Sequence, residues 1–168
     1  MNALDCMLTR SSVKKYKSDP VPKELMDKII QAGLCAPSGL NKQAPIILAV
    51  TDKQVRDELS AINAGKDPFK RADPFYNAPC VLVVLADKSV PTYLYDGSLV
   101  MENLLLAAHA LGLGACWIHR AKETFDRPEW QAFLKRVEKE NANLILAGDL
   151  LNNSTRGTKF ANPFDEAL

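Results

Sequence analysis

The chain has 168 residues, of which 47% are hydrophobic and 24% charged, a composition typical of one folded domain with a sizeable core and unlike that of a disordered or collagen-like chain. Its 21 Lys and Arg residues nearly balance its 20 Asp and Glu residues, so the net charge of +1 provides no general attraction to nucleic acid or to an anionic membrane. We therefore expect neither as a partner, and any anion site must be local.

The cysteines and the N-terminal sequence indicate the cellular compartment of the protein. Four cysteines are scattered without a C-x-x-C pair, and most sit among apolar neighbours, which is typical of buried thiols under reducing conditions. The N-terminus lacks an apolar signal core, and the longest apolar region, 99–118, is interrupted by Glu102, Asn103 and His109. We expect a cytoplasmic protein in which this region forms a core helix.

The first third of the chain begins with the basic stretch "RSSVKK" at 10–15. Apolar residues at helical spacing then predict a helix that begins near Pro22 and ends before Pro37. The β-branched run at 46–51 predicts a buried strand, and Asp52 is expected to cap the helix that follows it. The order is therefore helix, strand, helix.

The remaining elements follow the same alternation. Residues 64–79 contain "KDPF" and "ADPF", too short a similarity for a repeat architecture, and we expect a mobile flap there. The pattern then predicts a strand at 80–86, a long helix at 96–111 that is apolar on nearly every face, a strand at 115–118, an amphipathic helix from Pro128 and a strand at 143–148. A polar, irregular tail follows from 149.

Alternating helices and strands favour a doubly wound parallel sheet as the generic fold. Because no strand runs into a helix through a G-x-G-x-x-G turn, a Rossmann dinucleotide site is disfavoured. The sequence also lacks a G-x-S-x-G elbow and a Walker A loop, which removes the most easily recognised hydrolase and kinase readings.

The basic stretch has two interpretations. Arg10, Ser12 and Lys14 are alternate residues, so in an extended segment they would point the same way and could converge on a phosphate. A solvated basic turn would have the same sequence, and spacing alone favours it.

A second polar stretch, "APSGLNKQAP", follows the first predicted helix. Pro37, Ser38, Gly39 and Asn41 are residues that build turns and bring the backbone close to a ligand, although a loop that merely ends a helix would look the same. Since the two polar stretches flank one helix, they could line one crevice.

The two histidines do not suggest a metal centre. His109 lies within the long apolar helix and is expected to be a hydrogen-bonded core residue, whereas His119 follows a strand end, a common location for site residues. A Cys116–His119 nucleophile pair is disfavoured because residues three apart on a strand face opposite sides. We expect no metal and no catalytic side chain of this kind.

Taken in order, "RSSVKKY", "PVPKELMDKIIQAGLCAPSGLNKQ", "NLLLAAHALGLGACWIHRA" and "LILAG" closely resemble the nitroreductase family of FMN-dependent oxidoreductases, over roughly residues 3–135. The resemblance implies an α+β fold with a mostly antiparallel central sheet flanked by helices, in place of the parallel sheet. It also implies an intertwined homodimer that binds FMN at two interface sites, with the long apolar helix at the interface. We expect residues 1–168 to form a single nitroreductase-like domain.

The same resemblance suggests which residues bind the cofactor. By position, Arg10, Ser11 and Ser12 would hold the FMN phosphate, and Lys14 would contact the ribityl chain and pyrimidine edge. A cation at that edge would stabilise negative charge on the reduced flavin. The loop residues Pro37, Ser38, Gly39 and Asn41 would face the isoalloxazine, Pro37 and Ser38 on the other subunit's flavin. The strand-end residues Trp117, Ile118 and His119 would pack beside the ring.

Two departures from the family pattern stand out. Many members carry Glu-Gly where this chain has His119 and Arg120, which implies a bulkier and more cationic surface over the ring. The tail at 149–168 lacks the Lys-Pro-Arg-like segment that completes the phosphate site and wraps the partner in relatives, and Lys159 is the best substitute, with Arg156 next.

The predicted function is hydride transfer from NADH or NADPH through FMN to a small-molecule acceptor, such as a nitroaromatic or a quinone, by a ping-pong mechanism. The alternatives are an FMN-binding protein without efficient turnover, or a reductase of the same fold with different chemistry, such as enone reduction or dehalogenation. The flap at 64–79 carries Phe69, Phe75 and Tyr76, which we expect to select the acceptor by stacking over it. Sequence leaves open the physiological acceptor, the choice of nicotinamide and any proton donor.

Overall fold

The computed structural model of the chain describes residues 1–65 and 71–128, together with residues 130, 132, 133 and 135. The helices are α1 (Ala3–Thr9), α2 (Lys23–Leu34), α3 (Lys53–Ala64), α4 (Tyr93–Ala110) and α5 (Ala121–Phe125), with a short 3₁₀ helix, η1 (Gly39–Asn41). The strands are β1 (Ile46–Val50) and β2 (Val81–Leu85).

The two strands form an antiparallel pair, with Ile46 opposite Leu85 and Val50 opposite Val81. The expected parallel pairing is therefore wrong for these strands, and the α+β fold with an antiparallel sheet is confirmed. The alternation of helices and strands favoured a parallel sheet, but the described part of the connection between β1 and β2 contains α3 and a loop that return the chain antiparallel to β1.

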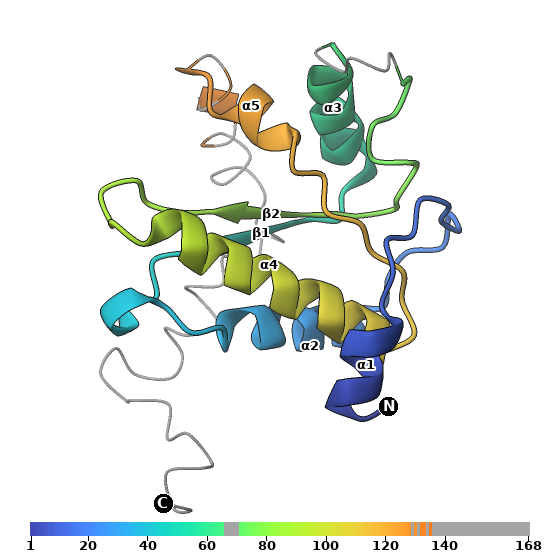
Figure 1. The fold of residues 1–168 in the computed structure, drawn as a ribbon. Coiled ribbons are helices and arrows are strands. Elements are labelled where there is room, and N and C mark those ends of the chain that lie inside the picture. The colour runs from blue at the N-terminus through green and yellow to red at the C-terminus, as the bar shows by residue number, and fades with distance from the viewer. Residues whose placement is uncertain (66–70, 129, 131, 134, 136–168) are drawn as a thin grey trace, which may run out of the picture.

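The sheet lies between two helical layers (Figure 1), with α1, α2 and α4 on one side and α3 and α5 on the other. Alternate residues of β1 point to opposite faces: Ile47 and Ala49 pack in the core with α2 and α4, whereas Leu48 and Val50 pack with Leu59 of α3. Burial on both faces explains why β1 reads as a continuous apolar run.

Helices α2 and α4 pack closely against each other. At Gly33 an added Cβ would lie 2.6 Å from a Leu104 side-chain atom and 2.9 Å from one of Ile47, so a larger residue would require these side chains to shift. Asn103 donates a hydrogen bond of 2.9 Å to the carbonyl of Ala32 across the same contact.

The ends of two helices follow the sequence signals. Asp52 caps α3 as predicted, because its carboxylate accepts a hydrogen bond of 2.9 Å from the Val55 amide. Helix α4 ends at Ala110 and is followed by Gly112, whose φ of 78° is left-handed, and the Leu113 amide donates to the Ala108 carbonyl at 2.8 Å. This is a Schellman termination, and it turns the chain back toward residue 115.

Several expected elements differ or lie outside the described residues. The strand expected at 115–118 is reduced to a single parallel bridge between Ala115 and Ser12. Among the described residues its pairing partner is the short extended segment around Ser12, which pairs with it at this one position. The strand expected at 143–148 and the tail lie outside the described residues, as does most of the helix expected from Pro128. In the part of the chain described, no helix is both long and apolar enough to cross a membrane.

Candidate functional site

The N-terminal basic segment, residues 10–14, lies beside the chain that follows α4. The Val13 amide donates a hydrogen bond of 3.0 Å to the Ala115 carbonyl, and Ser12 forms the bridge to Ala115. The approach is close enough that a Cβ on Gly114 would lie 2.8 Å from the Val13 side chain. The fold therefore brings together two of the predicted site segments, 10–14 and 117–119.

The basic segment keeps its polar groups near solvent. Arg10 is half-buried at the end of α1, while Ser11, Ser12 and Lys14 are exposed. No ion pair joins Arg10 or Lys14 to a carboxylate among the residues that the structure describes. Two cations and two hydroxyl groups are thus available to an anion such as a phosphate.

The residues after Ala115 present an aromatic surface next to this segment. Trp117 and His119 are exposed and meet edge to face, with ring centroids 5.6 Å apart. Ile118 between them packs against the core formed by Leu48, Val50, Leu59 and Phe75. The alternation fixes which side chains can face a ligand: Trp117 and His119 can, and Ile118 can contribute only its backbone.

Two tyrosines that sequence reasoning gave no role in cofactor binding also lie here. Tyr76 stands near Lys14, whose Nζ is 5.8 Å from the ring centroid. Burial raises the pKa of Tyr16 to about 12, with further contributions from Cys116, Tyr76 and Cys80. The sequence could have indicated Tyr16, because it lies two positions after Lys14, and alternate residues of an extended segment point to the same face.

The second predicted loop, 36–43, is anchored to the beginning of α4. The Gly39 amide donates a hydrogen bond of 3.0 Å to Asp96, which also accepts one of 2.8 Å from Thr92. Asp96 is only 3% exposed, and sequence analysis did not single it out as part of the site. Within the loop the Ser38 hydroxyl accepts a hydrogen bond of 2.9 Å from the Gln43 amide, and Leu40 and Asn41 both have a φ of 52°.

The two polar segments do not line one crevice within a single chain, as the sequence suggested they could. Segment 10–14 lies at the C-terminal end of α4, where Thr9 contacts His109 at 2.9 Å, whereas loop 36–43 lies at its N-terminal end. The thirteen helical steps from Asp96 to His109 span about 20 Å. Figure 1 shows η1 and the segment after α1 at opposite ends of α4. The length of α4 separates the two segments, and the spacing of the motifs along the chain did not predict this separation.

Three further expectations are resolved by position. His109 is hydrogen-bonded, as expected, through its contact with Thr9, which ties α1 to α4, but it is half-buried at the surface of α4 and not a core residue. Arg120 extends toward α3, where it donates to the Asn63 carbonyl at 3.5 Å, so it does not simply add charge over the aromatic surface. Lys159 and Arg156 lie outside the described residues.

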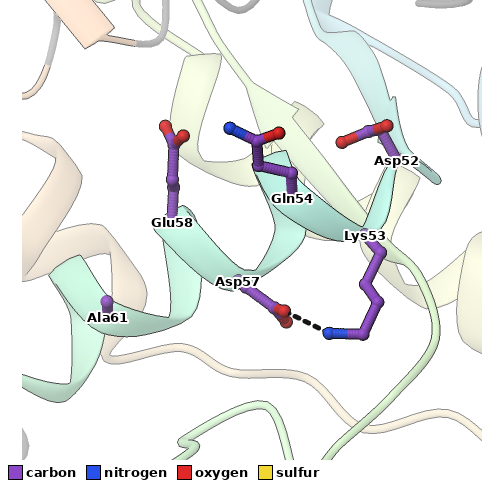
Figure 2. A pocket seen from close by; sticks show the side chains of 6 residues that line it. All are labelled: Asp52, Lys53, Gln54, Asp57, Glu58 and Ala61. Atoms are coloured by element: carbon purple, nitrogen blue, oxygen red, sulfur yellow. Dashed lines mark hydrogen bonds and ion pairs between the residues drawn. The ribbon is translucent and has the colours of Figure 1, made fainter.

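A wider depression lies elsewhere, along α3 (Figure 2). Its volume is about 690 Å³, and its lining residues come from one end of α3: Asp52, Lys53, Gln54, Asp57, Glu58 and Ala61. Three carboxylates and one lysine, itself paired with Asp57, would repel a phosphate. A smaller cavity of about 60 Å³ lies beneath Pro37 and Ser38, too small for a cofactor in one chain.

Comparison with known proteins agrees with this geometry. The nitroreductase family profile matches residues 7–147. A candidate NADH dehydrogenase/NAD(P)H nitroreductase of Methanothermobacter thermautotrophicus is 32% identical over 70% of this chain and 60% of its own length, and the NADPH-flavin oxidoreductase of Vibrio harveyi is 30% identical over 70% of this chain and 53% of its own. The chain thus spans between half and two thirds of the length of these two curated relatives.

A solved structure shares the fold. The FMN-bound nitroreductase of Bacteroides fragilis NCTC 9343 superimposes with a TM-score of 0.75 at 28% identity, covering 82% of this chain and 80% of that one. On the sequence match and the shared fold, the chain belongs to the nitroreductase family.

Proposed function

We propose that this protein is an FMN-dependent oxidoreductase that takes hydride from NADH or NADPH and passes electrons to a small-molecule acceptor, such as a nitroaromatic or a quinone, in a ping-pong cycle. The observation that carries the proposal is the pairing of Val13 with Ala115, which sets the basic segment beside the aromatic strand end. The FMN bound to the Bacteroides fragilis enzyme and the flavin activity of the Vibrio harveyi relative support it. The flavin would supply the hydride chemistry.

The residues of segment 10–14 suit the cofactor's phosphate. Arg10 offers a guanidinium, Ser11 and Ser12 offer hydroxyl groups, and these groups need no described partner to be displaced first. Lys14 lies two residues further along the extended segment, so it would reach past the phosphate toward the ribityl chain and the pyrimidine edge. Its ammonium would stabilise negative charge that accumulates there on reduction.

The segment 117–119 would form the wall beside the ring. Trp117 and His119 present exposed aromatic faces, and the backbone of Ile118 is held in place by its side chain in the core. A rigid backbone beside a flavin can hold a hydrogen bond at fixed geometry while solvent supplies protons. No side chain of this chain is assigned a nucleophilic role.

The separation of the two polar segments supports a homodimer. Loop 36–43 carries Pro37, Ser38, Gly39 and Asn41 but lies at the far end of α4 from segment 10–14, so it would complete the site of a second copy. Large apolar side chains are exposed around α4 and this loop: Leu40 at 93%, Tyr95 at 70% and Leu99 at 44%. Such surfaces are typical of a subunit interface.

Other parts of the proposal rest on sequence alone. Residues 1–168 would form one domain in the cytoplasm, with Lys159 completing the phosphate site. The residues at 149–168 would then lie along the partner subunit, as the family pattern implies.

The first test is spectroscopic. Purified protein should be yellow or bind added FMN, and anaerobic NADH or NADPH should bleach the flavin, after which an acceptor restores the colour. Arg10→Ala should weaken FMN binding by roughly ten- to a hundredfold, because a charge-assisted hydrogen bond contributes about 1.5–3 kcal/mol. Lys23→Ala, which removes an equal charge from the exposed start of α2, is the matched control.

The outcomes separate the alternatives. Protein that binds FMN but is bleached by neither nicotinamide would be a flavin-binding protein without turnover. Bleaching with no reoxidation by nitroaromatics or quinones would favour enone reduction or dehalogenation. Unchanged FMN affinity in Arg10→Ala would refute the phosphate assignment.

A further inference from the structure

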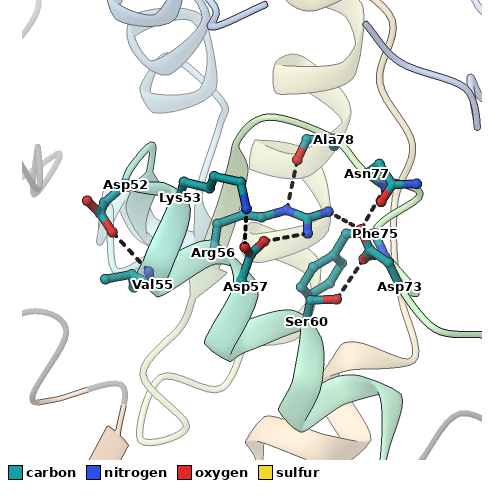
Figure 3. Close-up of polar contacts among 10 residues, drawn as sticks. All are labelled: Asp52, Lys53, Val55, Arg56, Asp57, Ser60, Asp73, Phe75, Asn77 and Ala78. Carbon is teal, nitrogen blue, oxygen red and sulfur yellow. Dashed lines mark hydrogen bonds and ion pairs between the residues drawn. The ribbon is translucent and has the colours of Figure 1, made fainter. Parts of the chain in front are cut away.

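The loop that precedes β2 is organised by one carboxylate, Asp73 (Figure 3). Its oxygens accept hydrogen bonds of 2.8 Å from the amides of Phe75 and Asn77 and one of 2.7 Å from the Ser60 hydroxyl, and Arg56 forms an ion pair with it. The carboxylate thereby joins α3 to two amides of its own loop. Residues 71–79 were expected to be part of a mobile flap, and these contacts instead fasten them to α3.

The cation of this pair is buried. Arg56 is 7% exposed, and besides Asp73 it donates hydrogen bonds of 2.8 Å to the Ala78 carbonyl and 3.0 Å to Asp57. A buried guanidinium with all of these partners in place is costly to leave unpaired. We call Arg56, Ser60 and Asp73 the loop clamp.

The clamp holds the backbone in a conformation that it would otherwise avoid. Tyr76 and Asn77 have φ of 56° and 58°, in the left-handed region; asparagine tolerates this region, but a residue such as tyrosine rarely adopts it. Phe75, predicted to stack over an acceptor, is instead 5% exposed and packs with Leu48 and Val50, anchoring the loop from the other side. Such strain persists where surrounding contacts over-determine the conformation.

The left-handed residue Tyr76 lies beside Lys14 of the predicted cofactor segment, residues 10–14. The Tyr76 ring centroid lies 5.8 Å from Lys14 Nζ, within the range of a cation–π contact, and Arg71 donates a hydrogen bond of 2.8 Å to the Tyr76 hydroxyl. Tyr76 is half-buried, whereas Lys14 is exposed and lacks a described carboxylate partner. The ring is therefore a fixed support for a flexible side chain.

We propose that Tyr76 is a positioning residue: held by the loop clamp, its ring fixes the Lys14 ammonium where it stabilises the reduced flavin. The inference rests on the proposed function, because it assumes that Lys14 faces the pyrimidine edge of FMN. A four-carbon lysine chain otherwise samples many rotamers, and fixing it before reduction lowers the cost of stabilising the new charge. Tyr76 acts through Lys14 and itself transfers neither electron nor proton.

The test is a mutant cycle read by the flavin midpoint potential of the full-length, FMN-loaded protein. Lys14→Met should make the potential more negative, and Tyr76→Ala should shift it in the same direction. The Tyr76→Ala shift should correspond to a roughly two- to fivefold loss of affinity for reduced relative to oxidised FMN, the size of an exposed cation–π contact. Tyr76→Phe, which keeps the ring, should restore the wild-type potential.

The double variant decides whether Tyr76 acts through Lys14. In the Lys14→Met background, Tyr76→Ala should produce no further shift. A wild-type potential in Tyr76→Ala, or an equal shift with and without Lys14, would overturn the inference and leave the FMN assignment intact. Wild-type protein that binds no FMN would instead refute the proposed function and the inference with it. A Lys14→Met variant with an unchanged potential would refute the placement of Lys14 at the pyrimidine edge, and with it the inference, while leaving FMN binding in place.

A second variant guards against a folding defect. Tyr76→Leu keeps apolar bulk but has no π face, so it should fold like Tyr76→Phe, as checked by thermal unfolding, while shifting the potential like Tyr76→Ala. A Tyr76→Leu potential equal to that of Tyr76→Phe would show that bulk alone suffices and would contradict the proposal.

Discussion

The Asp73 carboxylate illustrates how one residue organises its surroundings through opposing effects. Burial by itself raises its pKa, but hydrogen bonds from Ser60 and Arg56 and from the amides of Phe75 and Asn77 outweigh burial, so the pKa lies below its usual range. The ionised form is therefore the one that holds the loop.

This pKa predicts an acid-sensitive contribution to stability. Because the folded pKa is lowered, the stabilisation is present above the unfolded value of about 3.9 and is lost as pH falls through the folded pKa. The difference in urea-unfolding free energy between wild type and Asp73→Asn should therefore be largest near neutral pH and shrink below about pH 4. The pKa of Asp57 is also lowered, by hydrogen bonds from Lys53 and Arg56. Because Asp57 is present in both proteins, its contribution to the pH dependence largely cancels in the difference between their unfolding free energies.

Asp19→Asn, which removes an exposed carboxylate, provides the control for loss of one negative charge. A difference between wild type and Asp73→Asn that is the same at every pH would contradict the role assigned to the ionised carboxylate.

At the scale of elements, the end of α4 determines whether the two halves of the predicted site meet. Gly112 has a left-handed φ of 78°, and an added Cβ would meet no atom within 4 Å, so the requirement for glycine is conformational and not steric. Gly112→Ala should lower the unfolding free energy by about 1 kcal/mol. Gly112→Asn should lose less, since asparagine tolerates this region, and equal losses measured by urea denaturation would count against the conformational account.

The contact between α2 and α4 predicts a steric effect. Gly33→Val would place side-chain atoms into the space filled by Leu104 and Ile47, and overpacking of this kind typically costs about 1–3 kcal/mol. Gly65→Val, at the end of α3 where the nearest described atom is 3.6 Å from an added Cβ, should be tolerated better. Similar unfolding midpoints for the two variants would show that the helices can move apart without cost.

At the scale of the molecule, the length of α4 separates segment 10–14 from loop 36–43, and the proposed dimer is what would reunite them. Leu99→Lys should therefore both dissociate the protein, as measured by analytical ultracentrifugation, and weaken FMN binding. The reason is that a charge placed in an apolar interface is desolvated without a partner. Gln31→Lys, an exposed site on α2, controls for the added charge. A wild-type monomer that binds FMN tightly would disprove the two-copy site.

Much of the local structure could be predicted because it depends on near neighbours. The periodicity of α2, the β-branched run of β1 and the Asp52 cap are local signals, and the structure confirms each within a few residues. The basic segment and the Pro37–Asn41 loop were also identified by residue type. Strand direction was not, because antiparallel pairing depends on where the β1–β2 connection returns the chain.

The sequence by itself determined α2, α3, α4 and the two strands, the family and the residues suited to a phosphate and a flavin, since these depend on residue type and spacing along the chain; the short helices α1 and α5 were not predicted. Only the tertiary structure decided that Tyr76 stands over Lys14, that Phe75 is buried, and that Asp96 and Asp73 hold the two loops. These contacts join residues from 2 to 62 positions apart, most of them between different elements. They follow from the packing of layers, which no local pattern in the sequence encodes.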